Sequence, residues 1–410
     1  MEIQEVLLEI LRKAIRPEYV LSDIEGIKGE DWESVMRLAQ EHAILPMVYE
    51  TVWNEESFRR IPVQMQREYK TRVQYQVIEQ VQNTSTFLKL YQGMLNIDVT
   101  PLVVKGIICR NMYRLPDYRN SGDEDILIKR EEFSKLDLFL QQQGFVRQWF
   151  EGDIQTAHEI AYYNPRNRMR LEIHLSLFPE ESGSYGRLNR EFPQVFERHI
   201  TQKIQGVEIH TLDETQHMLY LLCHGLKHFL HSGFGVRQLC DMILFAEKHG
   251  EVIDWNEIRR RTKRQKMYVF WMNLFDIGER YLGFSWDKAH LRRPGKAMLD
   301  SRGLLDDIMD SGVFGKRSEE RLHSANITLE ASNQSGQRRL GVVAALFPSA
   351  EYMRRQYPYL LRKKWLLPAA WVQRMIAYKK EMRGRGMAGA VEAGRQRVKL
   401  LKKYGIIEKR

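Results

Sequence analysis

The sequence predicts an α+β fold, in which a small mixed β-sheet near the middle of the chain is flanked by N-terminal and C-terminal helical regions. Residues 168–177 alternate between apolar and polar side chains, as a half-buried strand does. Residues 99–128 read as a strand, a glycine turn, a short helix and a second strand. Apolar residues recur at helical spacing over residues 1–95 and again over 211–310. Helices set apart from a short sheet are typical of the α+β class.

The first helical region contains two amphipathic segments, VLLEILRKAI and WESVMRLAQEHAILPMVYETV, and then a long polar helix that runs through Tyr91. The second helical region opens at Asp213-Glu214, and acidic residues are typical of the first turn of a helix. We expect the two regions to bracket the sheet.

A glycine turn separates the first strand from the short helix. Val99–Val104 is an apolar run with β-branched residues, Lys105-Gly106 ends it, and Ile107–Tyr113 has the apolar spacing of a short helix. Glycine lets the backbone approach a ligand closely, and free N–H groups at a helix start attract anions. With Lys105 beside them, these groups predict a site for an anion such as a triphosphate.

Two aspartates begin the second strand. Side chains alternate along a strand, so Asp123 and Asp125 point to one face and Glu124 to the other. Two carboxylates that are so close repel each other, and a divalent cation between them removes the repulsion. An Asp-x-Asp pair by itself is a weak signal, because solvated acidic pairs are frequent at strand starts.

The alternating strand at residues 168–177 offers a third carboxylate. Its apolar face carries Met169, Leu171, Ile173, Leu175 and Leu177, and its polar face carries Arg170, Glu172, His174 and Ser176. If this strand lies beside the strand of Asp123, Glu172 completes a cation site or acts as the base that takes a proton from an incoming hydroxyl.

The order of these features resembles the DNA-polymerase-β-type nucleotidyltransferase superfamily, and most closely a bacterial group labelled as an uncharacterised nucleotidyltransferase family. The resemblance covers most of the chain, including LFPSAEYMRRQYPYL at residues 346–360. It implies catalysis and magnesium binding by Asp123, Asp125 and Glu172, and nucleotide binding by Lys105, Gly106, Arg119, Ser121 and Gly122. It also implies that His158 and His174 lie at the acceptor or behind the metal ligands.

On this reading the chain has four regions. They are an N-terminal helical region (1–95), a nucleotidyltransferase core (96–210), a helical acceptor-side region (211–350) and a basic helical tail (351–410).

Two positions depart from the superfamily pattern. The turn is Lys-Gly, where Gly-Ser or Gly-Gly is common, so a serine hydroxyl for phosphate is lost. Glu124 stands between the aspartates, where an apolar residue is normal. A charge on the packed face of a strand is costly unless it is paired. Either Glu124 meets a cation such as Lys129 or Arg110, or the strand is splayed and the site is weakened.

The second helical region contains three histidines at helical spacing, His224, His228 and His231. We favour a helix face that lines or caps the active site, over a structural face and over zinc binding, since Gly225 excludes the protease signature. Arg237 and Asp241, four residues apart, are expected to form an ordinary side-chain pair.

Composition sets outer limits on the class of protein. The chain has 410 residues, of which 43% are hydrophobic and 28% charged, as is ordinary for a soluble globular protein of two or three structural units. Three cysteines without a Cys-x-x-Cys motif indicate reduced thiols in a cytoplasm. The sequence shows no signal-peptide pattern and no apolar run long enough to span a bilayer.

The net charge of +10 arises from the C-terminal part of the sequence. Residues 351–410 contain 17 Lys and Arg against 4 Asp and Glu, a net charge of +13, so the remaining 350 residues have a net charge of −3. Within this part, residues 364–380 mix tryptophan, aliphatic and basic residues, as an amphipathic helix does. Such a helix docks on the protein body, on RNA or on an anionic membrane, and we favour the body.

These features predict a nucleotidyltransferase that moves a nucleoside monophosphate from a nucleoside triphosphate, with ATP favoured, to a hydroxyl of a small-molecule, peptide or protein acceptor. Two Mg²⁺ ions would assist. One alternative is a catalytically degenerate nucleotide-binding or scaffold protein, which Glu124 favours. Another is an RNA-modifying nucleotidyltransferase that grips RNA through the basic tail. The sequence does not select the acceptor, the triphosphate or the oligomeric state.

Overall fold

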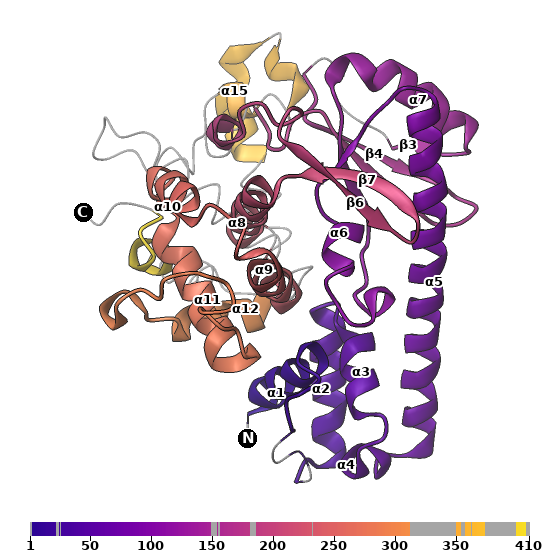
Figure 1. Ribbon diagram of the computed structural model, residues 1–410. Coiled ribbons are helices and arrows are strands. Elements are labelled where there is room, and N and C mark those ends of the chain that lie inside the picture. The colour runs from indigo at the N-terminus through magenta and orange to yellow at the C-terminus, as the bar shows by residue number, and fades with distance from the viewer. Residues whose placement is uncertain are drawn as a thin grey trace. The chain divides into compact units, whose positions relative to one another are not determined.

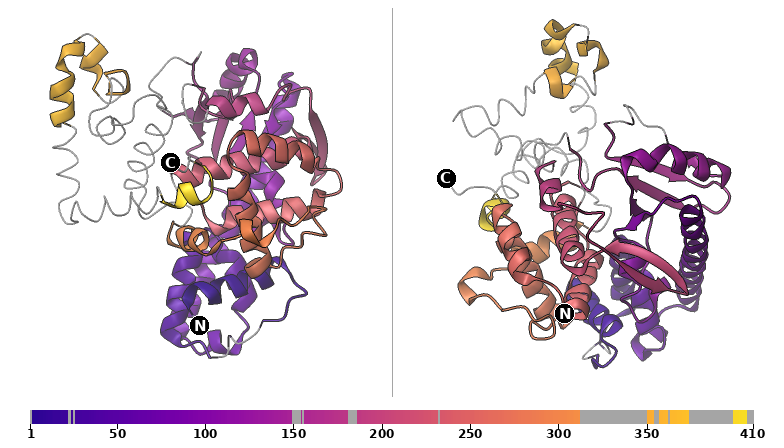
Figure 2. Two further views of the ribbon diagram at one scale, coloured as in Figure 1. Left: turned by 90° about the vertical axis from the view of Figure 1, so that its left-hand side faces the viewer. Right: turned by 45° about the horizontal axis from the view of Figure 1, so that its top comes forward.

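The structure is a computed structural model of the chain (Figures 1 and 2). It describes residues 2–21, 24, 26–148, 154, 156–180, 186–231, 233–311, 350–353, 357–361, 363–373 and 399–406. The chain divides into two compact units, one of residues 1–229 with 233–316 and the other of residues 230–232 with 317–410. The sheet and all residues of the candidate site lie in the first unit, so each unit is described by itself. The predicted division into four regions stays a prediction.

The first unit begins with helices. Their bounds are α1 Ile3–Ile15, α2 Gly29–Glu41, α3 Leu45–Val52, α4 Glu56–Arg59 and α5 Val63–Asn96. Trp32 of α2 meets Phe58 of α4 edge to face, with ring centroids 5.1 Å apart. The long helix α5 buries only its last part in the core of the sheet, where Phe87, Tyr91 and Met94 are fully buried. In Figure 1, α5 runs from the small helices to the sheet.

The sheet has five short strands in the order β1-β2-β5-β4-β3. Their bounds are β1 Leu102–Val103, β2 Glu124–Leu127, β3 Val146–Arg147, β4 Glu159–Tyr163 and β5 Arg170–His174. Only the β2–β5 pair is parallel, so the sheet is mixed and the predicted α+β class is confirmed. One face buries Ile126, Ile173 and Ile160 in the core, and the other face carries Asp125, Glu159 and Glu172.

Short helices connect these strands. They are α6 Ile107–Arg110, η1 Pro116–Tyr118, η2 Arg130–Glu132, α7 Phe133–Gln142 and η3 Gly186–Glu191. A separate hairpin follows, with β6 His199–Ile204 and β7 Val207–Leu212. It is anchored to the sheet because Thr211 donates a hydrogen bond to the carbonyl oxygen of Val103 at 2.6 Å.

The helices after the hairpin are α8 Glu214–His231, α9 Val236–His249, α10 Trp255–Arg264, α11 Tyr268–Leu282, η4 Lys296–Met298 and α12 Arg302–Ser311. As the acidic turn predicts, Asp213 caps α8: its carboxylate accepts from the N–H of Gln216 at 2.8 Å. Most of α9 and α11 is buried, as expected for helices covered on several sides. Among the described helices, none is both long and apolar enough to cross a membrane.

The second unit is described only in part, by α15 Ala350–Met353, η5 Pro358–Leu361, η6 Lys364–Leu366 and helical stretches at 367–373 and 399–403. Met353, Leu360 and Ala370 form a small core there. The predicted amphipathic helix at 364–380 is therefore described as far as 373, and the rest of it lies outside the described residues.

Candidate functional site

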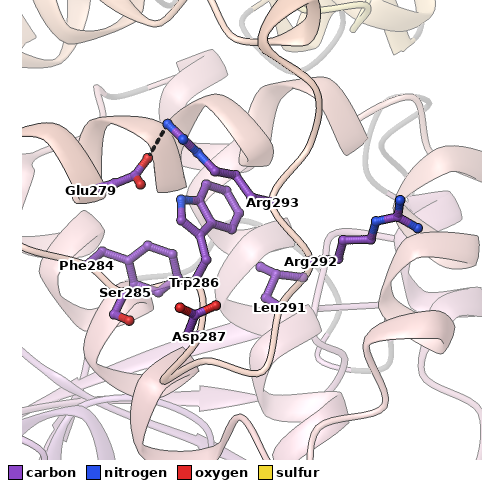
Figure 3. Close-up of a pocket in the computed structure, with 8 residues that line it drawn as sticks. All are labelled: Glu279, Phe284, Ser285, Trp286, Asp287, Leu291, Arg292 and Arg293. Carbon is purple, nitrogen blue, oxygen red and sulfur yellow. Dashed lines mark ion pairs between the residues drawn. The ribbon is translucent and has the colours of Figure 1, made fainter.

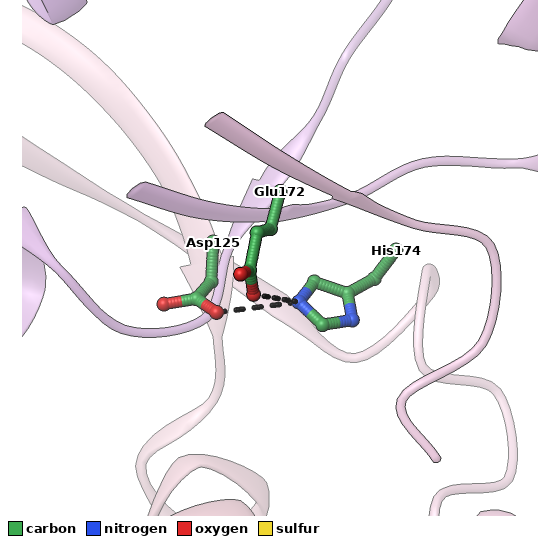
Figure 4. A group of neighbouring side chains, drawn as sticks. All are labelled: Asp125, Glu172 and His174. Carbon is green, nitrogen blue, oxygen red and sulfur yellow. Dashed lines mark hydrogen bonds and ion pairs between the residues drawn. The ribbon is translucent and has the colours of Figure 1, made fainter. Parts of the chain in front are cut away.

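The parallel pair β2–β5 brings the predicted acidic residues together. Asp125 and Glu172 are direct partners in the register. Alternation along β5 then places His174 on the same face as Glu172. Ligand atoms of Asp125, Glu172 and His174 all lie within 4.8 Å of one another (Figure 4). His174 Nε2 lies 3.3 Å from Asp125 Oδ1 and 4.0 Å from Glu172 Oε2.

Asp123 lies just before β2 and is not part of this group of three. The sequence predicts Asp123, Asp125 and Glu172 as the ligands, whereas the structure gathers His174 with Asp125 and Glu172. Asp123 is nevertheless close enough for its charge to raise the pKa of Glu172. It therefore belongs to the same acidic region, beside the three clustered ligands.

The two clustered carboxyl groups have opposite pKa shifts. Burial is the largest cause that raises the pKa of Glu172 to about 9, and the neighbouring charges of Asp125 and Glu159 contribute to the same rise. Burial also opposes ionisation of Asp125, but Lys105 and His174 more than offset it, so the pKa of Asp125 is lowered. In the absence of a cation, Asp125 is a carboxylate at neutral pH and Glu172 holds a proton.

Lys105 is the cation nearest to the cluster. Its ammonium group lies 3.8 Å from Asp125 Oδ2, and its side chain is only 13% exposed. Burial alone would lower the pKa of Lys105, but Asp125 and Asp123 outweigh it and the pKa is raised. Lys105 is therefore charged and sits at the acidic face, as a phosphate-binding lysine would.

The start of α6 is already occupied by Glu124. The N–H of Ile107 donates to Glu124 Oε2 at 2.9 Å, so the prediction that this N–H is free for a phosphate is wrong. Gly106 has a φ of +50°, a conformation that favours glycine. A Cβ at Gly106 would also collide with the Glu124 carboxylate. In this structure, Gly106 makes room for a side chain of the protein.

Glu124 also finds the cation that the sequence required. Arg110 Nη2 lies 2.5 Å from Glu124 Oε1, and both side chains are almost completely buried. Of the two partners proposed, Arg110 and Lys129, the structure selects Arg110. The strand keeps its register with β5 over four residue pairs, so Glu124 does not splay it.

The predicted phosphate ligand Arg119 is used within the protein. Its Nε donates to Asp241 Oδ1 at 3.1 Å, its Nη2 contacts Asp241 Oδ2 at 2.5 Å, and its Nη1 donates to Ser121 Oγ. Tyr113 donates to Asp241 Oδ1 at 2.7 Å. The prediction that Asp241 pairs with Arg237 is therefore wrong. Asp241 instead anchors the loop that leads to Asp123.

Ser121 and Gly122 occupy the end of this loop. Ser121 Oγ accepts from Arg110 at 2.9 Å as well as from Arg119. Its N–H donates to Gln80 Oε1 of α5 at 2.7 Å. Gly122 is exposed, and a Cβ there would meet nothing within 4 Å. The loop is thus fixed by Ser121, and Gly122 leaves space next to Asp123.

The histidines of α8 lie near the acidic face. His224 Nε2 and His228 Nε2 are 3.2 Å apart. Burial is the largest cause that lowers the pKa of His228 to about 3, and the charges of Lys105 and Lys227 contribute to the same shift. Burial and Lys105 also lower the pKa of His224. Both imidazoles are therefore neutral at pH 7. Because Lys105 affects the pKa of each, both histidines lie near the site.

His158 and Glu159 lie next to each other at the start of β4, and the sequence predicted only His158 as a site residue. His158 is a third exposed and lies 3.8 Å from Glu159 Oε2, next to β4. Glu159, which sequence reasoning missed, lies 3.8 Å from His174 Nδ1. The available signal was the alternation of β4, because Glu159 is the direct partner of His174 in the register.

The donor set suits a divalent cation. Asp125 Oδ2 is buried and has no hydrogen-bond partner among the described residues, which is costly unless a cation or another charge compensates it. Two carboxylates and an imidazole are common ligands of such ions. Asp125, Glu172 and His174 could therefore hold a metal ion.

A separate cavity lies at the end of α11 (Figure 3). Its volume is about 590 Å³, and Trp286, Glu279 and Arg293 are among the residues that line it. Arg293 and Glu279 form an ion pair at 2.8 Å. None of the lining residues belongs to the acidic face, so this cavity is distinct from the candidate site.

A small mixed sheet with acidic side chains on adjacent strands, a lysine-glycine turn beside them and helical flanks defines a nucleotidyltransferase type of enzyme. A family model described as uncharacterised nucleotidyltransferase matches residues 28–283. The chain belongs to this family, which confirms the resemblance, and it is a nucleotidyltransferase. Searches of curated proteins and of solved structures gave no significant match.

Proposed function

We propose that the chain transfers a nucleoside monophosphate from a nucleoside triphosphate, with ATP as the first candidate, to a hydroxyl of a small-molecule, peptide or protein acceptor. The observation that supports it best is the cluster of Asp125, Glu172 and His174 beside Lys105. In the proposed step the acceptor oxygen bonds to the α-phosphorus, and the bond from that phosphorus to the bridging oxygen breaks. Pyrophosphate leaves with the electron pair, and the acceptor proton passes to solvent.

The acidic side chains have distinct roles in this proposal. Asp125, Glu172 and Asp123 would hold two divalent cations, expected to be Mg²⁺, which would neutralise phosphate charge and acidify the acceptor hydroxyl. Glu172 must lose its proton to become a ligand, whereas Asp125 is already ionised. His174 contacts both carboxyl groups and orients them. Lys105 attracts the phosphates to this face.

The nucleotide-binding roles of the glycine turn and the loop are more restricted. The Glu124 carboxylate occupies the space beside Gly106, and Arg119 forms an ion pair with Asp241. Gly106 and Arg119 therefore act by positioning the residues that bind the nucleotide. Ser121 accepts hydrogen bonds from two arginines, which leaves its hydroxyl hydrogen for a phosphate. Gly122 gives the nucleotide access to Asp123.

The structure weakens the reason for a catalytically degenerate alternative. That reading depended on Glu124, and Glu124 is satisfied by Arg110 and by the N–H of Ile107. The RNA-modifying alternative depends on the basic tail, most of which lies outside the described residues.

The test is to incubate the protein with magnesium and each α-labelled nucleoside triphosphate, in the presence of cell extract separated into RNA, protein and small-molecule fractions. We expect label in one fraction. Asp123→Ala and Asp125→Ala should each abolish labelling while the protein stays folded, as a cooperative thermal unfolding transition shows. Asp98→Ala, at an exposed position outside the site, is the matched control. Labelling that persists in both site variants would contradict the assignment.

A further inference from the structure

Two cations on the helices that follow the sheet lie close to the acidic site. The sequence assigned no role to Lys227 and expected Arg237 only to pair with Asp241. α8 carries Lys227, which is half-buried, and α9 carries Arg237, which is 7% exposed. Although burial opposes it, Lys105, His174 and Lys227 act together to lower the pKa of Asp125. The charge of Arg237 likewise favours ionisation of Asp123 against the effect of burial. Both cations therefore lie close enough to act on the aspartates.

Arg237 is a buried cation with an incomplete set of partners. Its Nη1 donates to the carbonyl oxygen of Asn120, three residues before Asp123. Its Nε is buried and has no hydrogen-bond partner among the described residues. Burial and the neighbouring charge of Arg119 lower the pKa of Arg237 to about 10. Because Asp241 is taken by Arg119, Arg237 has less negative charge around it than a buried guanidinium requires.

Lys227 is also available for a ligand. Within the described part of the chain it forms no hydrogen bond and no ion pair, although it is half-buried. Lys105, Lys227 and Arg237 all act on His228, whose pKa burial lowers to about 3. Three positive side chains therefore lie near His228, close to the carboxylate cluster.

A bound triphosphate needs such cations, because the N–H at the start of the short helix α6 is not free to bind its phosphates. The N–H of Ile107 is used by Glu124 and the guanidinium of Arg119 by Asp241. Phosphate oxygens bind best to charged donors such as lysine and arginine, and arginine adds a planar pair of donors. Lys227 and Arg237 supply these donors from the helical side of the site.

We propose that Lys227 of α8 and Arg237 of α9, together with Lys105, bind the β- and γ-phosphates of the nucleoside triphosphate. This inference rests on the proposed function. It places the β- and γ-phosphates of the substrate next to helices α8 and α9. As the bond between the α-phosphorus and the bridging oxygen breaks, the two helices neutralise the charge that moves onto pyrophosphate. The acceptor then approaches from the opposite side of the α-phosphorus, in line with the leaving group.

The experiment measures binding of three probes to the full-length protein in magnesium by titration calorimetry. The probes are ATP, AMP and inorganic tripolyphosphate, which has the phosphates without a base or sugar. Lys227→Ala and Arg237→Gln should each weaken ATP and tripolyphosphate binding by roughly tenfold or more, as expected for a lost charge-assisted contact. AMP binding should change by less than about twofold, because AMP has no β- or γ-phosphate. Lys248→Ala, at an exposed position of α9, is the matched control and should bind all three probes normally.

Each result has a defined meaning. If both variants bind tripolyphosphate as tightly as the wild type, or lose AMP binding as strongly as ATP binding, the inference is wrong and the proposed function still stands. If the wild type does not bind ATP, and binds none of GTP, CTP and UTP in the same calorimetric assay, the proposed function fails and the inference fails with it. Should Arg237→Gln unfold the protein, Lys227→Ala decides, because Lys227 is half-buried and forms no hydrogen bond or ion pair with the described residues.

Discussion

Glu124 shows how one buried side chain can satisfy several requirements of this site. A buried carboxylate is tolerated when a cation and hydrogen-bond donors surround it. Arg110 supplies the charge and Ile107 supplies an N–H, although burial still raises the pKa of Glu124. The two partners join the helix after the glycine turn to the strand of Asp125. A residue that looks like a defect in the motif therefore holds two elements of the site together.

Glu172 gives the metal-free protein a defined pH dependence. Its pKa is raised from 4.5 to about 9 in the folded protein, chiefly by burial. Between these values the folded state keeps a proton that the unfolded state loses. The free energy of unfolding should therefore fall as the pH rises from about 5 to 9. Urea unfolding in the presence of EDTA at a series of pH values measures this.

Glu172→Gln is the control for that experiment, because glutamine cannot lose a proton. The variant should show a flatter pH profile and greater stability than the wild type at pH 8 in EDTA. Parallel profiles for the two proteins would show that Glu172 does not hold the proton. The same variant should lose its response to added magnesium.

At the scale of single residues, local alternation predicts the main acidic positions. Asp125 and Glu172 face the same side because each lies in a strand of period two. The grouping of His174 with them, ahead of Asp123, depends on the register between β2 and β5, which pairs Asp125 with Glu172. A register between two strands that are far apart in the chain is not determined by either strand alone.

At the scale of elements, the loop from Tyr113 to Asp123 is held from two sides. Asp241 of α9 binds Arg119 and Tyr113, and Gln80 of α5 accepts from the N–H of Ser121. Sequence reasoning paired Asp241 with Arg237 because they are four residues apart on one helix. The actual partner, Arg119, is 122 positions away, and only tertiary packing brings the two together.

Asp241→Asn should destabilise the protein by about 3–5 kcal/mol, because it leaves Arg119 as an uncompensated buried charge. Nucleotide transfer should fall as well, since the loop that carries Asp123 loses an anchor. Denaturant unfolding at pH 7 measures the first effect, and the labelling assay measures the second.

Asp276→Asn provides a matched comparison on α11. Asp276 is buried like Asp241, but its partner Arg280 has a side chain that is 55% exposed and can turn to water. The second variant should therefore cost less stability and leave transfer intact. Equal losses of stability in the two variants would contradict the role given to the Arg119–Asp241 pair.

At the scale of the whole molecule, the candidate site and the basic tail belong to different compact units. The site residues lie in the unit of residues 1–229 and 233–316, and residues 351–410 belong to the other. The tail has a net charge of +13, whereas residues 1–350 have a net charge of −3. Nucleotide binding and any electrostatic attraction of polyanions are therefore separable properties.

A chain that ends at residue 316 should fold and bind ATP with magnesium as the full chain does, because it retains the sheet, its core and the helices α8 and α9. Attraction of RNA should be lost with the tail, and in the full chain it should weaken steeply as salt is raised. Calorimetry and filter binding at two salt concentrations measure both properties. Loss of ATP binding by the shortened chain would show that the second unit contributes to the site.

The fold class was predictable because hydrophobic period is a local property that each segment carries by itself. The strand at residues 168–177 and the helix opened by Asp213 needed no knowledge of the rest of the chain. The cationic side of the site was not predictable in this way. Lys227 and Arg237 look like ordinary helix residues until the fold brings their charges close to Asp125 and Asp123.

The contacts of Glu124 have a consequence for how this family can vary. Gly106, Arg110 and Glu124 are in contact with one another. A side chain at position 106 would collide with the Glu124 carboxylate, and replacing Arg110 or Glu124 alone leaves the other as an unpaired buried charge. Relatives with an apolar residue between the two aspartates should have lost the arginine too, whereas the positive φ of the turn still favours glycine at position 106. Positions 110 and 124 should therefore vary together, and their joint identity should divide the family into members whose phosphate turn is closed by a carboxylate and members whose turn is open.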